Sequence, residues 1–246
     1  EECFEFGWKV FDASEKYQTP VFGFSDLDLG MNKWASRGFE YPDEPIDRGK
    51  LVLTQEQMDS IDNYGRYRDV DGDGIPYRTL PGSGLDPILY RGTGHDEDGA
   101  YSEKPDVYFK LMQRLKRKID GARDYLPAPV IKEDSEQDIG VIFYGSMENT
   151  ISEIEDIVEE KIGKKISTCR VRALPLHSEV EAFMEKHNKI VVVEINRDAQ
   201  LYGIMRKEYP LHLLDKMLSV AYSDGMPPRG RLYAEQIIAA IEEAEI

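Results

Sequence analysis

The chain has 246 residues, 41% of them hydrophobic, and a formal net charge of −16. This surplus of negative charge argues against nucleic-acid binding, which needs a basic face, and against docking on anionic lipid. Cys3 and Cys169 are the only cysteines, which excludes a disulfide framework and the usual four-thiolate iron–sulfur cluster. The apolar runs are too short to span a bilayer, so we expect a cytoplasmic protein.

The N-terminal segment predicts a helix over residues 2–17, because Phe4, Trp8 and Phe11 recur at helical spacing. The chain begins inside this amphipathic pattern and without a methionine, so we expect it to be a fragment of a longer polypeptide. The apolar run at 21–25 (VFGFS) predicts a short buried strand.

Polar residues follow this predicted strand at the end where open parallel sheets bind ligands. They are Ser25, Asp26, Asp28 and Asn32. We favour the interpretation that Asp26 and Asp28 cap a turn, with a ligand site as the alternative.

Residues 33–104 are rich in Asp, Gly, Pro and Tyr and predict mostly irregular structure, with one short helix starting at Thr54 and capped by Gln57 or Glu56. Within this region, 66–97 is typical of a long functional or partner-binding loop. Apolar anchors argue that the loop is ordered. They are Tyr67, Ile75, Tyr77, Leu85, Ile88, Leu89 and Tyr90.

A basic amphipathic helix is predicted from about Pro105 to Ala122. Its apolar positions recur every four residues, at Val107, Leu111, Leu115 and Ile119. Its end is crowded with cations, which suit the helix dipole and predict a solvated face. These cations are Arg114, Lys116, Arg117 and Lys118.

The segment Leu126-Pro127-Ala128-Pro129 with the charged run after it is the best domain boundary. Beyond it, short apolar segments alternate with helical patterns. Strands are predicted at 139–144, 166–171 and 190–195, and helices at 149–161, 178–187 and from 200 to about 209. This alternation predicts a parallel, doubly wound α/β sheet.

Four further sequence patterns suggest sites. Asp69, Asp71 and Asp73 match half of a calcium loop, but Leu80 stands where a bidentate Glu is needed. The alternative is a pair of tight turns whose carboxylates accept from Arg78 or Arg68.

No glycine-rich phosphate loop is readable. The turn Gly145-Ser146 could offer amides to an anion, although it could serve only to reverse the chain. The polar cluster VEINRDAQ after the last predicted strand could form a site, and we favour an interface of salt bridges.

The loop sequence RGTGHDE places His95 beside Asp96 and Glu97 and close to Arg91. Arg91 and His95 could receive an acidic substrate by charge and hydrogen bonding. The alternative is a surface histidine bonded to Asp96.

In this order and spacing, the motifs SDLDLGMN, RYRDVDGDGIPYRTLPG, RGTGHDE, GSMENTISEIEDI, VEINRDAQ and SVAYSDGMP resemble the C-terminal part of the alpha subunit of 2-oxoacid:ferredoxin oxidoreductases of the 2-oxoglutarate type. The resemblance covers essentially the whole chain. It implies the end of a pyrimidine-binding domain at 1–32, a loop-rich connecting region at 33–130 and a transketolase C-terminal-like α/β domain at 131–246.

The resemblance also implies a function. That family uses thiamine diphosphate and magnesium to decarboxylate a 2-oxoacid oxidatively with coenzyme A, giving an acyl-CoA, CO2 and reduced ferredoxin. A beta subunit carries the diphosphate end of the cofactor, magnesium and an iron–sulfur cluster, so we expect this chain alone to bind no cofactor and no metal. The family's catalytic residues are expected upstream of Glu1, so the isolated chain should be inactive. Arg91 and His95 are then candidates for binding substrate or coenzyme A. The alternatives are a non-catalytic protein-interaction module and a calcium-binding module using Asp69, Asp71 and Asp73.

Overall fold

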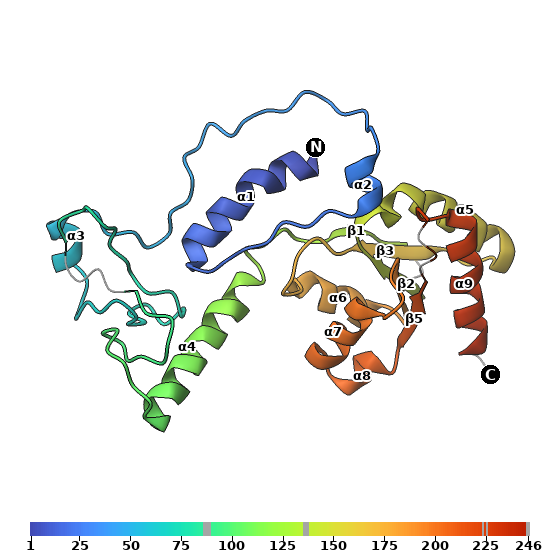
Figure 1. Ribbon diagram of the computed structural model, residues 1–246. Helices are drawn as coiled ribbons and strands as arrows, with labels where there is room; N and C mark the ends of the chain where they lie inside the picture. Colours follow the sequence, from blue (N-terminus) through green and yellow to red (C-terminus); the bar gives the residue numbers. More distant parts are fainter. Residues whose placement is uncertain (86–89, 135–137, 223, 225, 245–246) are drawn as a thin grey trace. The chain divides into compact units, whose positions relative to one another are not determined.

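The chain divides into two compact units in the computed structural model (Figure 1). Unit 1 comprises Glu1–Phe24 and Ala35–Tyr125, and unit 2 comprises Ser25–Trp34 and Leu126–Ile246. The structure describes residues 1–85, 90–134, 138–222, 224 and 226–244. The predicted loop anchors Ile88 and Leu89 lie outside these residues, and the division at 32 and 130 stays a prediction.

Unit 2 is built around a five-stranded sheet of order β1-β3-β2-β4-β5. The strands are β1 (Val130–Lys132), β2 (Ile139–Phe143), β3 (Ile166–Arg170), β4 (Lys189–Glu194) and β5 (Met217–Ala221). β2 through β5 pair in parallel, while β1 pairs antiparallel with β3. The predicted parallel α/β fold is therefore confirmed, with two edge strands that the sequence patterns did not reveal.

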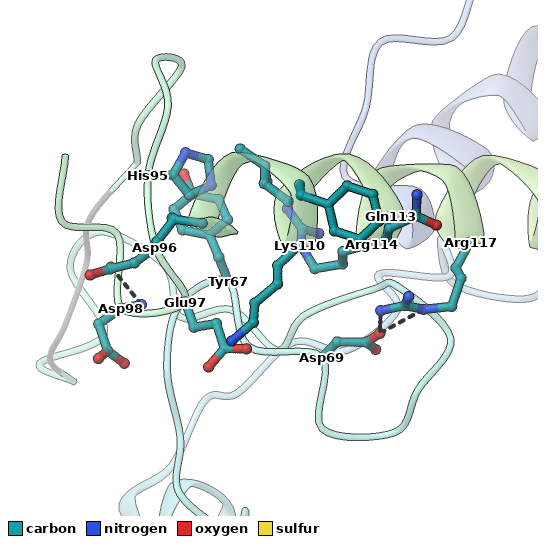
Figure 2. Close-up of a pocket in the computed structure, with 13 residues that line it drawn as sticks. Tyr67, Asp69, His95, Asp96, Glu97, Asp98, Lys110, Gln113, Arg114 and Arg117 are labelled. Atoms are coloured by element: carbon teal, nitrogen blue, oxygen red, sulfur yellow. Dashed lines mark hydrogen bonds and ion pairs between the residues drawn. The ribbon is translucent and has the colours of Figure 1, made fainter. Parts of the chain in front are cut away.

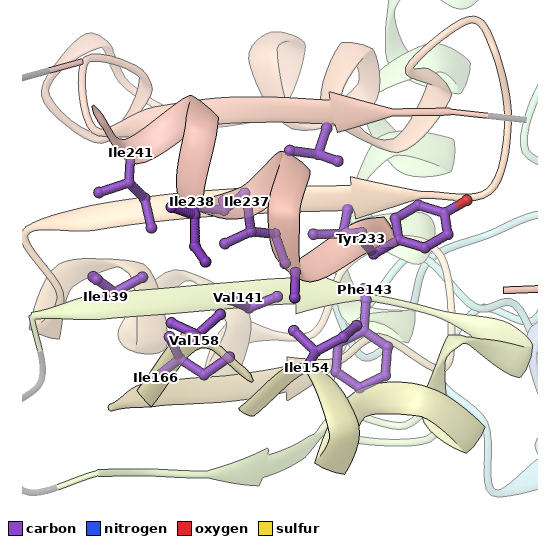
Figure 3. Packing of buried hydrophobic residues seen from close by; sticks show 14 of the residues in the cluster. Ile139, Val141, Phe143, Ile154, Val158, Ile166, Tyr233, Ile237, Ile238 and Ile241 are labelled. Carbon is purple, nitrogen blue, oxygen red and sulfur yellow. The ribbon is translucent and has the colours of Figure 1, made fainter. Parts of the chain in front are cut away.

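Helices cover both faces of this sheet. Side chains alternate between the two faces along each strand, and in β2 those on both faces are buried, so each face needs a covering layer. Ile139, Val141 and Phe143 pack in the layer that α5 (Ile151–Ile162) and α9 (Gly230–Glu243) cover (Figure 3). Ile142, Ile190 and Val192 pack in the opposite layer. The remaining helices of unit 2 are η1 (Gly145–Thr150), α6 (Ser178–Lys186), α7 (Gln200–Glu208) and α8 (Leu211–Leu214), of which α6 to α8 supply that second layer.

The polar cluster after β4 caps a helix. Ala199, the residue before α7, has no side-chain cap. Instead the carboxylate of Glu194, which is 1% exposed, accepts the N–H groups of Leu201 at 2.8 Å and Tyr202 at 3.0 Å. The Asn196 amide donates to the same carboxylate at 2.7 Å. Glu194 thus satisfies amide groups at the start of α7 that would otherwise lack acceptors.

Asp26 has two structural roles inside unit 2. Its Oδ1 accepts the N–H of Leu29 at 2.9 Å and caps α2 (Leu27–Met31), which confirms the predicted capping role for Asp26. Asp28 lies within α2 instead, and its carboxylate accepts from the Asn32 side chain at 2.6 Å. The Oδ2 of Asp26 accepts the N–H of Ser146 at 2.6 Å, at the turn that begins η1. The turn Gly145-Ser146 thus donates an amide N–H to an anion, as the sequence suggested, and that anion is the Asp26 carboxylate of the same chain.

The predicted strand at 21–25 is wrong. Residues 21–26 have no regular structure, and the side chains of Phe22 and Phe24 are 74% and 90% exposed. A buried strand needs hydrogen-bonded neighbours on both sides, and the described part of the chain provides no strand that pairs with this segment.

Unit 1 holds three helices among its described residues and is otherwise irregular, as predicted. They are α1 (Glu2–Tyr17), α3 (Gln55–Asp59) and α4 (Pro105–Ala122). The predicted cap of α3 is present as a reciprocal capping box between Thr54 and Gln57. Pro105 occupies the first turn of α4, where its missing N–H costs nothing. No helix in the described ranges is both long and apolar enough to cross a membrane.

Candidate functional site

The loop 66–97 and helix α4 line a pocket of about 620 Å³ within unit 1, which we call the cationic pocket. Its ionisable lining residues, apart from tyrosines, are Arg66, Arg91, His95, Arg114 and Lys118. None of the described lining residues is acidic, although the chain as a whole carries a net charge of −16. Positive charge is therefore concentrated here against the overall trend.

Arg66 lies deep in the pocket wall, with 4% of its surface exposed. Its guanidinium carbon lies 4.6 Å from the ring centroids of both Tyr67 and Tyr90, a cation–π arrangement that fixes the group. Its Nε and Nη1 atoms are buried and have no hydrogen-bond partner in the described part of the chain. Buried N–H groups of this kind cost about 1–3 kcal/mol each when left unpaired.

Arg114 and Lys118 extend the positive charge along α4. They are four residues apart, so they lie on one face of the helix, and each is only 7% exposed. Arg114 Nη1 donates to the Gly74 carbonyl at 2.9 Å, and Lys118 Nζ donates to the Gln18 carbonyl at 3.4 Å. The predicted solvated face is therefore wrong for these two cations, because the Asp-Gly turns of the loop fold onto that side of α4.

Burial perturbs the ionisation of this cluster. It lowers the pKa of Lys118 to about 8, and the neighbouring positive charges of Arg114 and Arg66 add to the effect. Burial also lowers the pKa of Arg114, while the negative charge of the Asp69 carboxylate raises that pKa and partly offsets the effect. That carboxylate is already engaged: Asp69 Oδ2 lies 2.8 Å from Arg117 Nη2, and Oδ1 accepts the Gly74 N–H at 2.8 Å.

This perturbed lysine predicts a stability that depends on pH. The Lys118 pKa is about 8 in the folded chain, against an ordinary lysine value of 10.5 in the unfolded chain. Between these pH values the unfolded chain binds more protons, so this residue makes the free energy of unfolding rise with pH through that window. We expect Lys118→Met to raise the free energy of unfolding near neutral pH by about 1–3 kcal/mol and to remove this rise.

The measurement is urea unfolding near neutral and near alkaline pH, with hydrogen exchange of the α4 amides as the local probe. Lys116→Met is the matched control, because the Lys116 side chain is 67% exposed and pairs with Asp120 on the same helix. We expect the control to change stability by less than about 0.5 kcal/mol. A Lys118→Met chain that is less stable than the control at neutral pH would contradict the prediction.

The structure brings the two sequence-predicted site residues into the same cationic pocket. His95 is 7% exposed, and its ring centroid lies 3.9 Å from that of Tyr67. Its Nδ1 lies 2.7 Å from the Thr93 carbonyl, which can only accept, so Nδ1 carries a proton. Its Nε2 has no partner within the described ranges. Arg91 is half-buried, and its Nε donates to the Gly99 carbonyl at 2.9 Å.

The alternative view of His95, a surface histidine bonded to Asp96, is wrong. The carboxylate of Asp96 accepts N–H groups of its own loop, from Asp98 at 3.1 Å and Ala100 at 2.9 Å. A second pocket of about 480 Å³ shares Tyr67, His95, Leu111 and Arg114 with the cationic pocket (Figure 2). Its acidic lining residues are Asp69, Asp96, Glu97 and Asp98. Figure 2 shows its mixed charge, with Asp69 and Arg117 paired at one side.

The calcium alternative is not favoured. Asp71 and Asp73 both contact Lys50 Nζ, at 2.6 and 2.7 Å, while Asp69 pairs with Arg117. The described residues contain no group of three such side chains arranged around one point. The three aspartates therefore belong to tight turns, as the alternative predicted, but their carboxylates pair with Lys50 and Arg117 and not with Arg78 or Arg68. Arg78 pairs with Glu15, and Arg68 pairs with Asp98.

Sequence reasoning missed Arg66, Arg114 and Lys118 as site residues. A signal for the last two was present, because each lies three residues after an apolar position of α4, Leu111 or Leu115, and so beside the apolar stripe. Arg66 had no local signal beyond its place in the loop.

The chain is similar to known proteins along most of its length, although no family model matches it. It is 26% identical over 215 residues to the 2-oxoglutarate synthase subunit KorA of Methanothermobacter thermautotrophicus, covering 84% of this chain and 53% of that protein. It is also 26% identical, over 213 residues and with the same coverage, to the KorA subunit of Methanothermobacter marburgensis. The chain thus spans about half the length of these curated relatives.

A solved structure shares the fold. It is a 2-oxoglutarate:ferredoxin oxidoreductase from Magnetococcus marinus with 2-oxoglutarate, coenzyme A and succinyl-CoA bound. The TM-score is 0.66 at 21% identity, with 81% of this chain and 33% of that chain covered. Together these comparisons confirm the resemblance that the sequence motifs indicated.

Proposed function

We propose that this chain forms the C-terminal part of the alpha subunit of a thiamine-diphosphate-dependent 2-oxoglutarate:ferredoxin oxidoreductase. The whole enzyme would decarboxylate 2-oxoglutarate oxidatively with coenzyme A, giving succinyl-CoA, CO2 and reduced ferredoxin in the cytoplasm. The observation that carries the proposal is the similarity to KorA subunits over 84% of this chain. The parallel α/β sheet of unit 2 agrees with it, since a 2-oxoglutarate:ferredoxin oxidoreductase shares the fold.

The residues of this chain do not fit the redox group of such an enzyme. Cys3 is exposed on unit 1, whereas Cys169 is buried in unit 2, where burial raises the pKa of its thiol to about 12. A cluster needs several thiolates converging on one site. We therefore propose that a beta subunit carries the iron–sulfur cluster. The resemblance of the sequence motifs implies that this subunit also carries magnesium and the diphosphate end of the cofactor.

Within this proposal, Arg91 and His95 hold an anionic group of the 2-oxoacid or of coenzyme A. The bond from Arg91 Nε to Gly99 and the bond from His95 Nδ1 to Thr93 orient both side chains in the cationic pocket. A guanidinium grips a carboxylate or phosphate through parallel charge-assisted hydrogen bonds. A protonated imidazole would donate to the same anion from Nε2.

Substitution in the intact enzyme tests this role. We expect Arg91→Ala and His95→Ala each to lower kcat/KM for 2-oxoglutarate by about tenfold to a hundredfold, because a lost charge-assisted contact costs about 1.5–3 kcal/mol. Arg68→Ala is the control from the same loop, since Arg68 pairs with Asp98 and does not line the cationic pocket. Kinetics equal to those of the control would reduce Arg91 and His95 to scaffold residues. Loss of subunit assembly instead would make the loop an interface.

Purification of the intact complex tests the proposal as a whole. A full-length alpha subunit should co-purify with a cysteine-rich partner and reduce ferredoxin when 2-oxoglutarate and coenzyme A are supplied. A full-length protein that binds a partner without any such activity would instead be an interaction module.

A further inference from the structure

We propose that the cationic pocket binds a phosphate group of a phosphorylated small molecule, which Arg66, Arg114 and Lys118 hold from two sides. Arg66 comes from the loop, and the other two residues come from successive turns of α4. This inference deepens the proposed function, which places Arg91 and His95 in the same pocket, and it is argued from the contacts and charge of the pocket itself.

Among these three side chains, Arg66 has donors without a partner in the described part of unit 1. Arg66 Nε and Nη1 are buried without a partner in the described part of the chain. The hydrogen bond from Lys118 to the Gln18 carbonyl is long at 3.4 Å, and the bond from Arg114 to the Gly74 carbonyl uses only its Nη1. Side chains buried this deeply normally have their donors paired, so the free donors of Arg66 indicate a missing acceptor.

The charge of the pocket indicates what kind of acceptor is missing. Three cations are more than nine-tenths buried, and none of the described lining residues is acidic. A carboxylate would bring one negative charge and two oxygens. A phosphate ester brings about −1.5 to −2 charges and three acceptor oxygens. It therefore neutralises more of the buried charge and can accept from all three side chains.

The alternative is that a carboxylate of the protein neutralises the buried cations, and Asp69 is the carboxylate that acts on Arg114. Its existing contacts disfavour this alternative. Both of its oxygens are engaged, by Arg117 and by the Gly74 N–H. Cation–π contacts with Tyr67 and Tyr90 stabilise the Arg66 guanidinium but provide no acceptor for its N–H groups.

The size of the pocket indicates a ligand larger than phosphate. Its volume of about 620 Å³ is typical of small-molecule sites. Beside the cations, the wall presents Tyr108, Met112 and Leu115 from α4, which could contact an apolar or aromatic portion of the molecule. The phosphate would thus anchor one end of the ligand among the cations.

Calorimetry on the 246-residue chain tests the inference, with inorganic pyrophosphate as the probe and succinate as a dianion of carboxylate type. We expect saturable binding of pyrophosphate, and binding of succinate at least about tenfold weaker. Lys118→Met should weaken pyrophosphate binding by about tenfold to a hundredfold, while Lys116→Met leaves it unchanged. Lys118→Met is expected to stabilise the chain, so unfolding would not explain lost binding.

Three outcomes would overturn the inference. They are no saturable binding of pyrophosphate by the wild-type chain, equal affinities of the Lys116→Met and Lys118→Met variants, and succinate binding as tightly as pyrophosphate. Arg66→Met provides a second variant, and its unchanged affinity would remove Arg66 from the site. None of these results depends on oxidoreductase activity, so the inference and the proposed function can fail separately.

Discussion

Gly74→Ala is expected to lower the free energy of unfolding of unit 1 by about 3–5 kcal/mol. Gly74 has a φ of +82°, in the left-handed region that costs a residue with a Cβ about 1–2 kcal/mol. A Cβ at this position would also lie 2.5 Å from both the Arg114 carbonyl oxygen and the Lys118 amide nitrogen. Both are backbone atoms of α4, which cannot rotate away, so the loop would have to separate from the helix.

Gly72→Ala is the matched control from the same DGDG turn. Gly72 has a φ of +78°, but a Cβ there would meet nothing within 4 Å. We therefore expect only the conformational cost, about 1–2 kcal/mol. Urea unfolding combined with hydrogen exchange of the α4 amides measures the difference between the two variants. Equal destabilisation would show that the loop does not press against α4. Gly74→Ala should also abolish pyrophosphate binding, because the cationic pocket depends on this contact.

Glu194→Ala is expected to lower the free energy of unfolding of unit 2 by about 3–4 kcal/mol. The substitution removes the acceptor for the N–H groups of Leu201 and Tyr202 and for the Asn196 amide. Leu201 is buried and Tyr202 partly buried, so water replaces the lost acceptor poorly. Each unpaired buried donor costs about 1–3 kcal/mol, and a cavity adds to this loss.

Thermal unfolding followed by circular dichroism measures this effect. Asp198→Ala is the control, because the Asp198 side chain is 56% exposed and pairs with its neighbour Arg197. We expect the control to change stability by less than about 0.5 kcal/mol. Glu194→Gln keeps one acceptor and should fall between the two variants. A loss below about 1 kcal/mol for Glu194→Ala would mean that α7 does not depend on this cap.

The elements with strong local patterns could be predicted from the sequence. The bounds predicted for the helix from Pro105 to Ala122 match those observed for α4. The predicted bounds of the buried strands β2, β3 and β4 agree with the observed ones to within one residue at each end. The edge strand β1 was missed because it has three residues and is mostly exposed. β5 was missed because its buried positions are interrupted by exposed ones, so it does not form a continuous apolar run.

The errors have a common physical cause, which is contact between residues distant in sequence. The apolar run at 21–25 has strand propensity, yet a strand needs partners that local sequence does not reveal. Arg114 and Lys118 belong to a basic run, yet they are buried because a loop forty residues earlier folds onto them, with Gly74 accepting from Arg114. Composition could single out the loop and place Arg91 and His95 on it, but not the charges that complete the pocket.

The way the chain passes between its two units has a consequence for dissecting the gene. Ser25–Trp34 belongs to unit 2, although unit 1 precedes and follows it in the sequence. A truncated chain beginning at Leu126 would therefore lose Asp26, and the Ser146 amide would lose its acceptor. Unit 2 is better viewed as a two-fragment assembly, in which a short peptide complements the larger piece. A split-protein design could exploit this by supplying residues 25–34 in trans.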